Sequence, residues 1–247
     1  EGRLSQTSVL EEQVSRMLGD ERASSLVESF ASQWLHLRRM PSVAPDANAF
    51  PEFDENLRDA FIRETELFFQ SQLRTDRSVV ELLTSDYTFV NERLARHYGI
   101  PNIYGPRFRR VAVHEENRRG LLGHGSIHTV TSLATRTSPV IRGKWVLENI
   151  LGAPPPPPPP DVPELPARAD DGRMRSMRER MEEHRANPVC ASCHSRMDPL
   201  GFAMQNFDAI GKWRDDEGGA VIDASGALPD GRRFDGLSEL RDLLLLR

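Results

Sequence analysis

The chain has 247 residues, of which 38% are hydrophobic and 28% are charged, so it can bury a core and is not a disordered acidic tail. Its formal net charge of −5 argues against a protein that binds nucleic acid through a basic face. No apolar run is long enough to span a bilayer. We therefore expect no nucleic-acid partner and no transmembrane segment in this stretch of chain.

The N-terminal part of the chain has helical periodicity. Apolar residues recur at three- and four-residue steps, which places them on one face of a helix. In the strongest helical pattern, at 53–73, acidic residues stand in the first turns, where they interact favourably with the helix dipole. Helices are therefore expected at residues 9–18, 26–37, 53–73, 79–83 and 89–98, the last of them ended by Gly99.

The middle of the chain mixes extended, polar and helical patterns. Residues 109–114 alternate weakly and are expected to form a short strand. Residues 120–138 are rich in Gly, Ser and Thr and are expected to form a polar loop. Ser138 is a good N-cap and Pro139 suits the first helical position, so a helix is expected from here to Gly152.

A run of consecutive prolines fills positions 154–160. Proline has a fixed φ angle and no amide donor, so the run is expected to form a polyproline II helix of roughly 22 Å, at about 3.1 Å per residue. Such a helix is either a ligand for SH3- or WW-type domains or a stiff connector. We favour the connector, which would join a helical body to the C-terminal segment.

The C-terminal segment is expected to be short and irregular. A charged helix is predicted at 173–185, a turn at 197–201, a short helix at 202–210, and short strands among turns at 218–234. We expect this segment to pack against the body, because alone it is too small for a stable core. The expected fold class is mainly α, with minor irregular β near the C-terminus.

The most specific motif is Cys190-Ala191-Ser192-Cys193-His194, which reads C-x-x-C-H. This is the attachment pattern of c-type haem. Each thiol can form a thioether to a vinyl group of the haem, and His194 can bind the iron as the proximal axial ligand. The chain has only two cysteines, and both stand inside the motif, so haem c is the cofactor we favour.

Three other interpretations of the two cysteines remain open. A C-x-x-C pair can be half of a structural zinc site, although no second pair or H-x-x-x-H cluster completes the four ligands. It can be a redox dithiol of the thioredoxin type, although no βαβ pattern surrounds it. It can also form a Cys190–Cys193 disulfide.

Two longer stretches resemble a known family. "TRTSPVIRGKWVLENILGAPPPPPPPDVPEL" at 135–165 and "CASCHSRMDPLGFAMQNFDAIGKWR" at 190–214 are similar to a planctomycete-type cytochrome c family. Its members are long exported proteins made mostly of consecutive domains of unknown function, often with a further cytochrome c domain. Residues 30–99 and 222–246 resemble other parts of these proteins, so the resemblance covers nearly the whole chain.

The resemblance carries expectations about location and partners. It implies an exported protein, periplasmic or at the cell surface, and haem attachment of this kind is also completed outside the cytoplasm. The chain begins at Glu1 rather than Met, and we expect it to be an internal piece of a longer protein with an export signal upstream. The expected partner is a redox protein or another cytochrome domain of the same full-length chain.

The sixth iron ligand has two candidates. His124 is ranked first, because glycines flank it on both sides and the expected polar loop can approach a haem face. Met204 is the alternative distal ligand, and as a plain core methionine it would have no such role. Basic residues near the same segments are candidates for the haem propionates, namely Arg142, Lys144, Arg196, Lys212 and Arg214.

The expected domain organisation has three parts. These are a helical domain at 1–105, a loop-helix with the polyproline connector at 106–165, and a truncated haem-binding segment at 166–247. The favoured function is a c-type haem electron-transfer module of a larger exported protein, not an enzyme by itself. The alternatives are a haem peroxidase-like enzyme and a non-haem scaffold or interaction domain whose cysteines form a disulfide.

Overall fold

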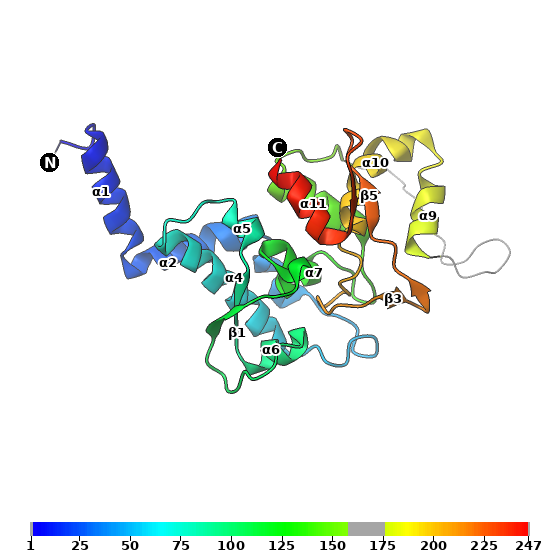
Figure 1. The fold of residues 1–247 in the computed structure, drawn as a ribbon, viewed down its shortest axis with the longest axis horizontal. Coiled ribbons are helices and arrows are strands. Elements are labelled where there is room, and N and C mark those ends of the chain that lie inside the picture. The colour runs from blue at the N-terminus through cyan, green and yellow to red at the C-terminus, as the bar shows by residue number, and fades with distance from the viewer. Residues whose placement is uncertain (1, 158–175, 247) are drawn as a thin grey trace. The chain divides into compact units, whose positions relative to one another are not determined.

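The computed structural model describes residues 2–157 and 176–246, and the expected domain boundary at 165/166 lies outside them. The chain divides into two compact units. The N-terminal unit comprises Glu1–Ser42 and Glu55–Ser126, and the C-terminal unit comprises Val43–Asp54 and Ile127–Arg247. Helices predominate in both units, with only short strands among the described residues, so the expected mainly α fold is confirmed (Figure 1).

The N-terminal unit is built around α4, Glu55–Arg74. This helix buries Leu57, Phe61 and Phe68 on one face, as the predicted periodicity requires. The expected helix at 26–37 is instead a series of short segments with a π-helical turn in it. The preceding elements are α1 (Thr7–Leu18), η1 (Glu21–Ala23), α2 (Ser24–Leu26), η2 (Val27–Ala31), α3 (Ser32–Trp34) and η3 (Leu37–Ser42).

The predicted helix at 89–98 is partly wrong. β1, Tyr87–Val90, pairs antiparallel with β2, Arg109–Ala112, and α6 begins only at Glu92. The side chain of Asn91 caps α6 by accepting a hydrogen bond of 2.9 Å from the backbone N–H of Leu94. α6 ends at Gly99 in the left-handed conformation, as expected. The short helix expected at 79–83 is observed as α5, Glu81–Thr84.

The polar loop expected from residue 120 onward is also partly wrong. Residues 121–130 form η5 (Leu121–Gly123) and α7 (Gly125–Val130), and their side chains are buried. The glycines of this stretch allow close packing, because a Cβ on Gly125 would overlap the ring of Phe61. The glycines that predicted a loop are therefore positions where neighbouring groups pack closely in the core. η4, Glu116–Arg118, precedes this stretch.

The C-terminal unit is built on the packing of α8, Pro139–Trp145, against α10, Pro188–Phe202. Two glycines allow the close approach, since a Cβ on Gly143 would overlap the Met197 carbonyl and one on Gly201 would overlap the Pro139 carbonyl. The cysteine-bearing segment therefore packs on an earlier helix, as expected. α8 starts at the predicted cap, where the Ser138 side chain accepts from the Ile141 N–H.

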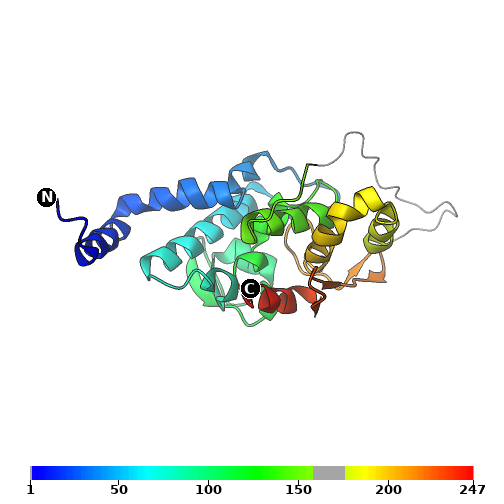
Figure 2. The same ribbon diagram turned by 90° about the horizontal axis from the view of Figure 1, so that it is seen from above.

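Helix α10 continues where a turn was predicted, because Met197 and Leu200 are buried along it. The short helix predicted at 202–210 is absent, and residues 203–206 form turns. The remaining elements of this unit are η6 (Val146–Ile150), α9 (Met177–His184) and α11 (Gly236–Leu245). α9 lies beside the first part of α10 in both views (Figures 1 and 2).

The short strands predicted near the C-terminus are confirmed as two small antiparallel hairpins. These are β3 (Asp216–Glu217) with β4 (Ala220–Val221), and β5 (Ser225–Ala227) with β6 (Arg233–Asp235). Of the proline run, positions 158–160 lie outside the described residues, as do residues 173–175 of the predicted charged helix. No helix in the described part of the chain has the length and apolar character to cross a membrane.

Candidate functional site

The C-x-x-C-H motif lies in the first half of α10. Asn187 caps the helix by accepting a hydrogen bond of 2.9 Å from the Val189 N–H, and Pro188 occupies the first helical position. Cys190 and Cys193 are three residues apart on a helix, and His194 is four residues after Cys190, so all three share one face. The structure describes both cysteines as free, partly buried thiols.

The imidazole of His194 is held by a carboxylate one turn later on the same helix. Its Nδ1 lies 2.9 Å from Oδ1 of Asp198, which is fully buried. Nε of Arg185 lies 3.6 Å from the other oxygen of Asp198. The Nε2 of His194 makes no hydrogen bond within the described ranges, so this nitrogen is available to a ligand.

A second histidine lies beside the first. The ring of His184, from the end of α9, meets the ring of His194 edge to face with centroids 4.8 Å apart. Burial lowers the pKa of the His184 imidazole, His194 adds to this effect, and Asp198 opposes it. Two imidazoles and two thiols therefore lie along the paired helices α9 and α10.

An apolar cavity of about 270 Å³ opens further along α10. Arg196 and Leu200 line it from α10, three and seven residues after Cys193, and Arg196 is exposed. Arg196 makes no ion pair with any residue that the structure describes. The other lining residues are mostly apolar and come from the end of η6 and the turn after β5, namely Leu147, Leu151, Ala153, Leu228 and Pro229. The site thus places an apolar hollow with one cation next to the motif.

These residues fit a covalently bound haem. Two unpaired thiols at the required spacing can form the thioethers, and the bare Nε2 of His194 can bind the iron. The zinc alternative lacks a ligand set, since the described residues contain no group of three or more His, Cys, Asp or Glu side chains placed to hold a metal ion.

His124, the first candidate for the sixth ligand, is buried in the N-terminal unit, whereas the motif belongs to the C-terminal unit. Its Nδ1 lies 3.0 Å from Oγ1 of Thr65, and its ring meets the ring of Phe68 edge to face. Burial, with Arg118 nearby, lowers the pKa of His124 to about 3, so the imidazole is neutral. Its Nε2 is buried and has no hydrogen-bond partner in the part of the chain that the structure describes.

Met204, the alternative ligand, lies in the same unit as the motif. It follows α10 directly and is 1% exposed. Its backbone carbonyl accepts a hydrogen bond of 2.6 Å from Arg142, a residue that had been a propionate candidate. Neither candidate is shown to face an iron, and the sixth ligand stays a prediction.

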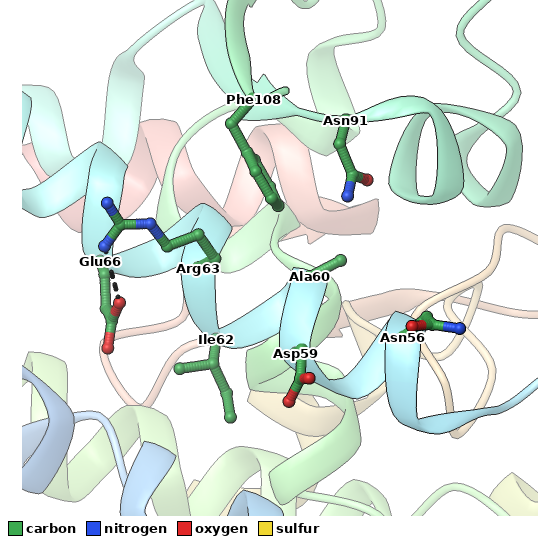
Figure 3. A pocket seen from close by; sticks show the side chains of 8 residues that line it. All are labelled: Asn56, Asp59, Ala60, Ile62, Arg63, Glu66, Asn91 and Phe108. Atoms are coloured by element: carbon green, nitrogen blue, oxygen red, sulfur yellow. Dashed lines mark hydrogen bonds and ion pairs between the residues drawn. The ribbon is translucent and has the colours of Figure 1, made fainter. Parts of the chain in front are cut away.

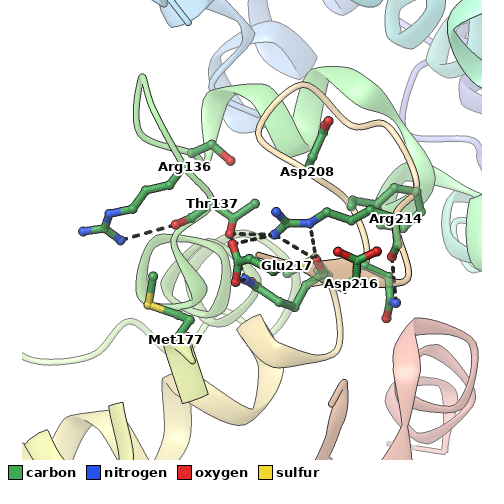
Figure 4. Close-up of polar contacts among 12 residues, drawn as sticks. Arg136, Thr137, Met177, Asp208, Arg214, Asp216 and Glu217 are labelled. Carbon is green, nitrogen blue, oxygen red and sulfur yellow. Dashed lines mark hydrogen bonds and ion pairs between the residues drawn. The ribbon is translucent and has the colours of Figure 1, made fainter. Parts of the chain in front are cut away.

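Most of the basic side chains considered for the haem propionates have other partners. Arg214 lies 3.0 Å from Glu217 and also donates to Thr137, as Figure 4 shows. Lys212 pairs with Glu52 at 2.9 Å, and Lys144 pairs with Glu148 at 3.6 Å. Arg142 is fully buried and bound to backbone carbonyls. Arg196 is the one that lines the cavity beside the motif.

Sequence reasoning missed Asp198 and Arg185. The available signal was the four-residue step from His194 to Asp198, which brings two side chains together on a helix. The sequence predicts a turn at 197–201, and a turn would separate the two side chains, so the sequence alone does not predict the pair.

The N-terminal unit has an open pocket of about 400 Å³ between α4 and the segment before β2 (Figure 3). Polar and apolar side chains both line it, and Arg63 and Glu66 pair with each other across one turn of α4 at 3.1 Å. The remaining lining residues are Asn56, Asp59, Ala60, Ile62, Asn91 and Phe108. No candidate residue from the sequence lies in this pocket.

Comparison with protein families found two matches. Residues 118–217, which include the motif, match the model PSCyt3, described as a protein of unknown function (DUF1588). Residues 1–100 match the model PSD4, described as a protein of unknown function (DUF1592). Both are names of planctomycete cytochrome-type domains of unknown function, and at this level the resemblance drawn from the sequence is confirmed. Searches of curated proteins and of solved structures found no significant match.

Proposed function

We propose that this chain is a c-type cytochrome module in which Cys190 and Cys193 hold one haem and His194 binds its iron. The observation that carries the proposal is the placement of two unpaired thiols and a bare imidazole Nε2 on one face of α10. Each thiol adds across one vinyl group, so that the sulfur bonds to the carbon next to the ring and the thiol hydrogen ends on the terminal carbon. The bound haem supplies reversible one-electron chemistry.

The residues around the motif have separate tasks in this proposal. The apolar side chains of the cavity beside Cys193 exclude water from one edge of the porphyrin. Arg196 donates to a propionate at the rim of that cavity. The cavity is slightly smaller than the usual ligand site of about 300–1,000 Å³, which suits a ring that is partly open to solvent and can exchange electrons with a partner.

The wider setting of the module is part of the same proposal. The match to cytochrome-type domain models and the resemblance to long exported proteins support a place in a larger exported protein. Electrons would then pass to another cytochrome domain of the same full-length chain or to a separate redox protein. His124 is the proposed sixth ligand, with Met204 as the alternative.

Mass spectrometry tests covalent attachment directly. The chain is exported to the periplasm of a host that carries haem-attachment machinery, and we expect a mass equal to the protein plus one haem. Cys190→Ser and Cys193→Ser should each reduce attachment, whereas Ser192→Ala, between them, should leave it unchanged. A bare protein mass, in a host that matures a control cytochrome, would refute the proposal.

The absorption spectrum separates the competing functions. A low-spin six-coordinate haem is expected for electron transfer, whereas a high-spin haem that reacts with peroxide would indicate a peroxidase-like enzyme. A protein with no Soret band and with a Cys190–Cys193 disulfide would indicate a scaffold. Each outcome therefore selects one of the three functions.

A further inference from the structure

We propose that Asp198 is a positioning residue for His194, fixing which ring nitrogen carries the proton and strengthening the other nitrogen as an iron ligand. The part of this inference that concerns iron rests on the proposed function. The geometry that carries it is the 2.9 Å contact between Oδ1 of Asp198 and Nδ1 of His194, four residues apart on α10.

The contact determines the tautomer of the imidazole. An ionised carboxylate only accepts hydrogen bonds, so a neutral imidazole that bonds to it carries its single proton on Nδ1. Nε2 then carries the lone pair, and it has no hydrogen-bond partner among the described residues. A carboxylate on the far nitrogen of a metal-binding histidine fixes the ring and raises its basicity. Asp198 therefore prepares His194 to bind a metal before any metal arrives.

The burial of Asp198 argues against a purely structural role for its contact with His194. Exposed i,i+4 pairs contribute little to stability, and a buried carboxylate is costly unless its oxygens are satisfied. Asp198 is 0% exposed, and its Oδ2 has no hydrogen bond in the described structure. A neutral side chain of similar size would avoid this cost. The carboxylate is therefore better explained by what its charge does to His194.

Arg185 moderates the effect. Its Nε lies 3.6 Å from Oδ2 of Asp198, on the side away from His194. The guanidinium draws part of the carboxylate charge away from the imidazole. Removing Arg185 should therefore strengthen the hydrogen bond that Asp198 accepts from His194, and removing Asp198 should abolish it. Two variants of the same chain are thus expected to change the site in opposite directions.

The first test needs no haem. Long-range ¹⁵N NMR of the full chain purified without haem should show a protonated Nδ1 and a bare Nε2 for His194. In Asp198→Asn the amide can donate to Nδ1, and the proton is expected to move to Nε2. Asp20→Asn makes the same change of charge next to Arg22, in the N-terminal unit, and should leave the tautomer unchanged. A proton on Nε2 of His194 in the unaltered chain would overturn the inference.

The second test uses the haem-loaded chain. Loss of the carboxylate should make Asp198→Asn easier to reduce, Arg185→Gln should be harder to reduce, and Asp20→Asn should keep the original midpoint potential. If Asp198→Asn does not fold, Arg185→Gln still tests the inference through the sign of its shift. Equal potentials in all variants would overturn it. Failure of the unaltered chain to bind haem would instead refute the proposed function, and the tautomer result would stand independently.

Discussion

Arg142 donates a hydrogen bond of 2.6 Å from its buried guanidinium to the backbone carbonyl of Met204. The same group donates to the carbonyls of Phe207 and Asp208, at 2.7 Å and 2.6 Å. One side chain of α8 thus satisfies three carbonyls of the segment that follows α10. This explains how that segment holds a defined path without forming the helix that its sequence suggested.

Replacement of Arg142 should strongly destabilise the C-terminal unit. Arg142→Met removes the guanidinium donors from the carbonyls of Met204, Phe207 and Asp208, and we expect a loss of about 3–5 kcal/mol in the free energy of unfolding, as for other broken buried charge networks. Denaturant unfolding followed by circular dichroism measures the loss. Lys144→Met, at a half-exposed position of the same helix, is the control and should cost less than about 1 kcal/mol. Equal losses in both variants would contradict the role of Arg142.

The crossing of α8 and α10 should not tolerate a methyl group. Gly143→Ala places a Cβ onto the carbonyl of Met197, which belongs to helix backbone and cannot move aside. We expect a loss of about 3 kcal/mol or more, at the upper end of overpacking effects. Gly19→Ala is the control, because a Cβ there meets only ordinary contacts at 3.5 Å and the φ angle is negative. Thermal unfolding of the two variants compares them.

Glu64 should make the N-terminal unit less stable as the pH rises. Burial raises the pKa of this carboxyl from 4.5 to about 7, although Thr88, Tyr98 and Arg118 oppose the shift. The folded protein therefore keeps a proton that the unfolded chain releases above pH 4.5. The stabilisation that Glu64 contributes is fully present below pH 4.5 and is lost progressively up to about pH 7, by ~3 kcal/mol in total.

Comparison with Glu64→Gln isolates this effect. His124 acts in the opposite direction, because its pKa is lowered from 6.5 to about 3 and the folded state loses stability as the pH falls below 6.5. Both proteins contain His124, so the difference between their unfolding free energies reports Glu64 alone. The unfolding free energy of the unaltered protein should therefore fall relative to that of Glu64→Gln as the pH rises from 4.5 to about 7. A difference that stays constant over this range would show that Glu64 titrates normally.

The sixth ligand can be identified from variant spectra of the haem-loaded chain. We expect His124→Ala to convert a low-spin spectrum to a high-spin one, since the Nε2 of His124 has no hydrogen-bond partner among the described residues and would be the atom that binds iron. Met204→Leu, which keeps an apolar core side chain, should leave the spectrum unchanged. If only Met204→Leu changes it, Met204 is the ligand. If neither does, the sixth position is open, and the peroxidase-like function becomes the better explanation.

Local interactions explain what sequence reasoning predicted correctly. The C-x-x-C-H spacing of Cys190, Cys193 and His194 is visible in the sequence alone, and the structure adds that the three residues share one face of α10. Ser138 and Gly99 mark helix ends because caps use backbone groups a few residues away. The strong periodicity of α4 likewise identified its buried face, because a long amphipathic helix shows that face in its own sequence.

Contacts between distant segments decided the rest. Residues 87–90 became a strand because 109–112 pairs with them, and the glycines before α7 proved to be positions of close packing. α10 continues through Pro199 because Met197 and Leu200 are buried against neighbouring elements. Only this continuation places Asp198 one turn after His194 on the same helix. The sequence by itself therefore determined the C-x-x-C-H motif, and the tertiary structure decided which carboxylate lies against its histidine.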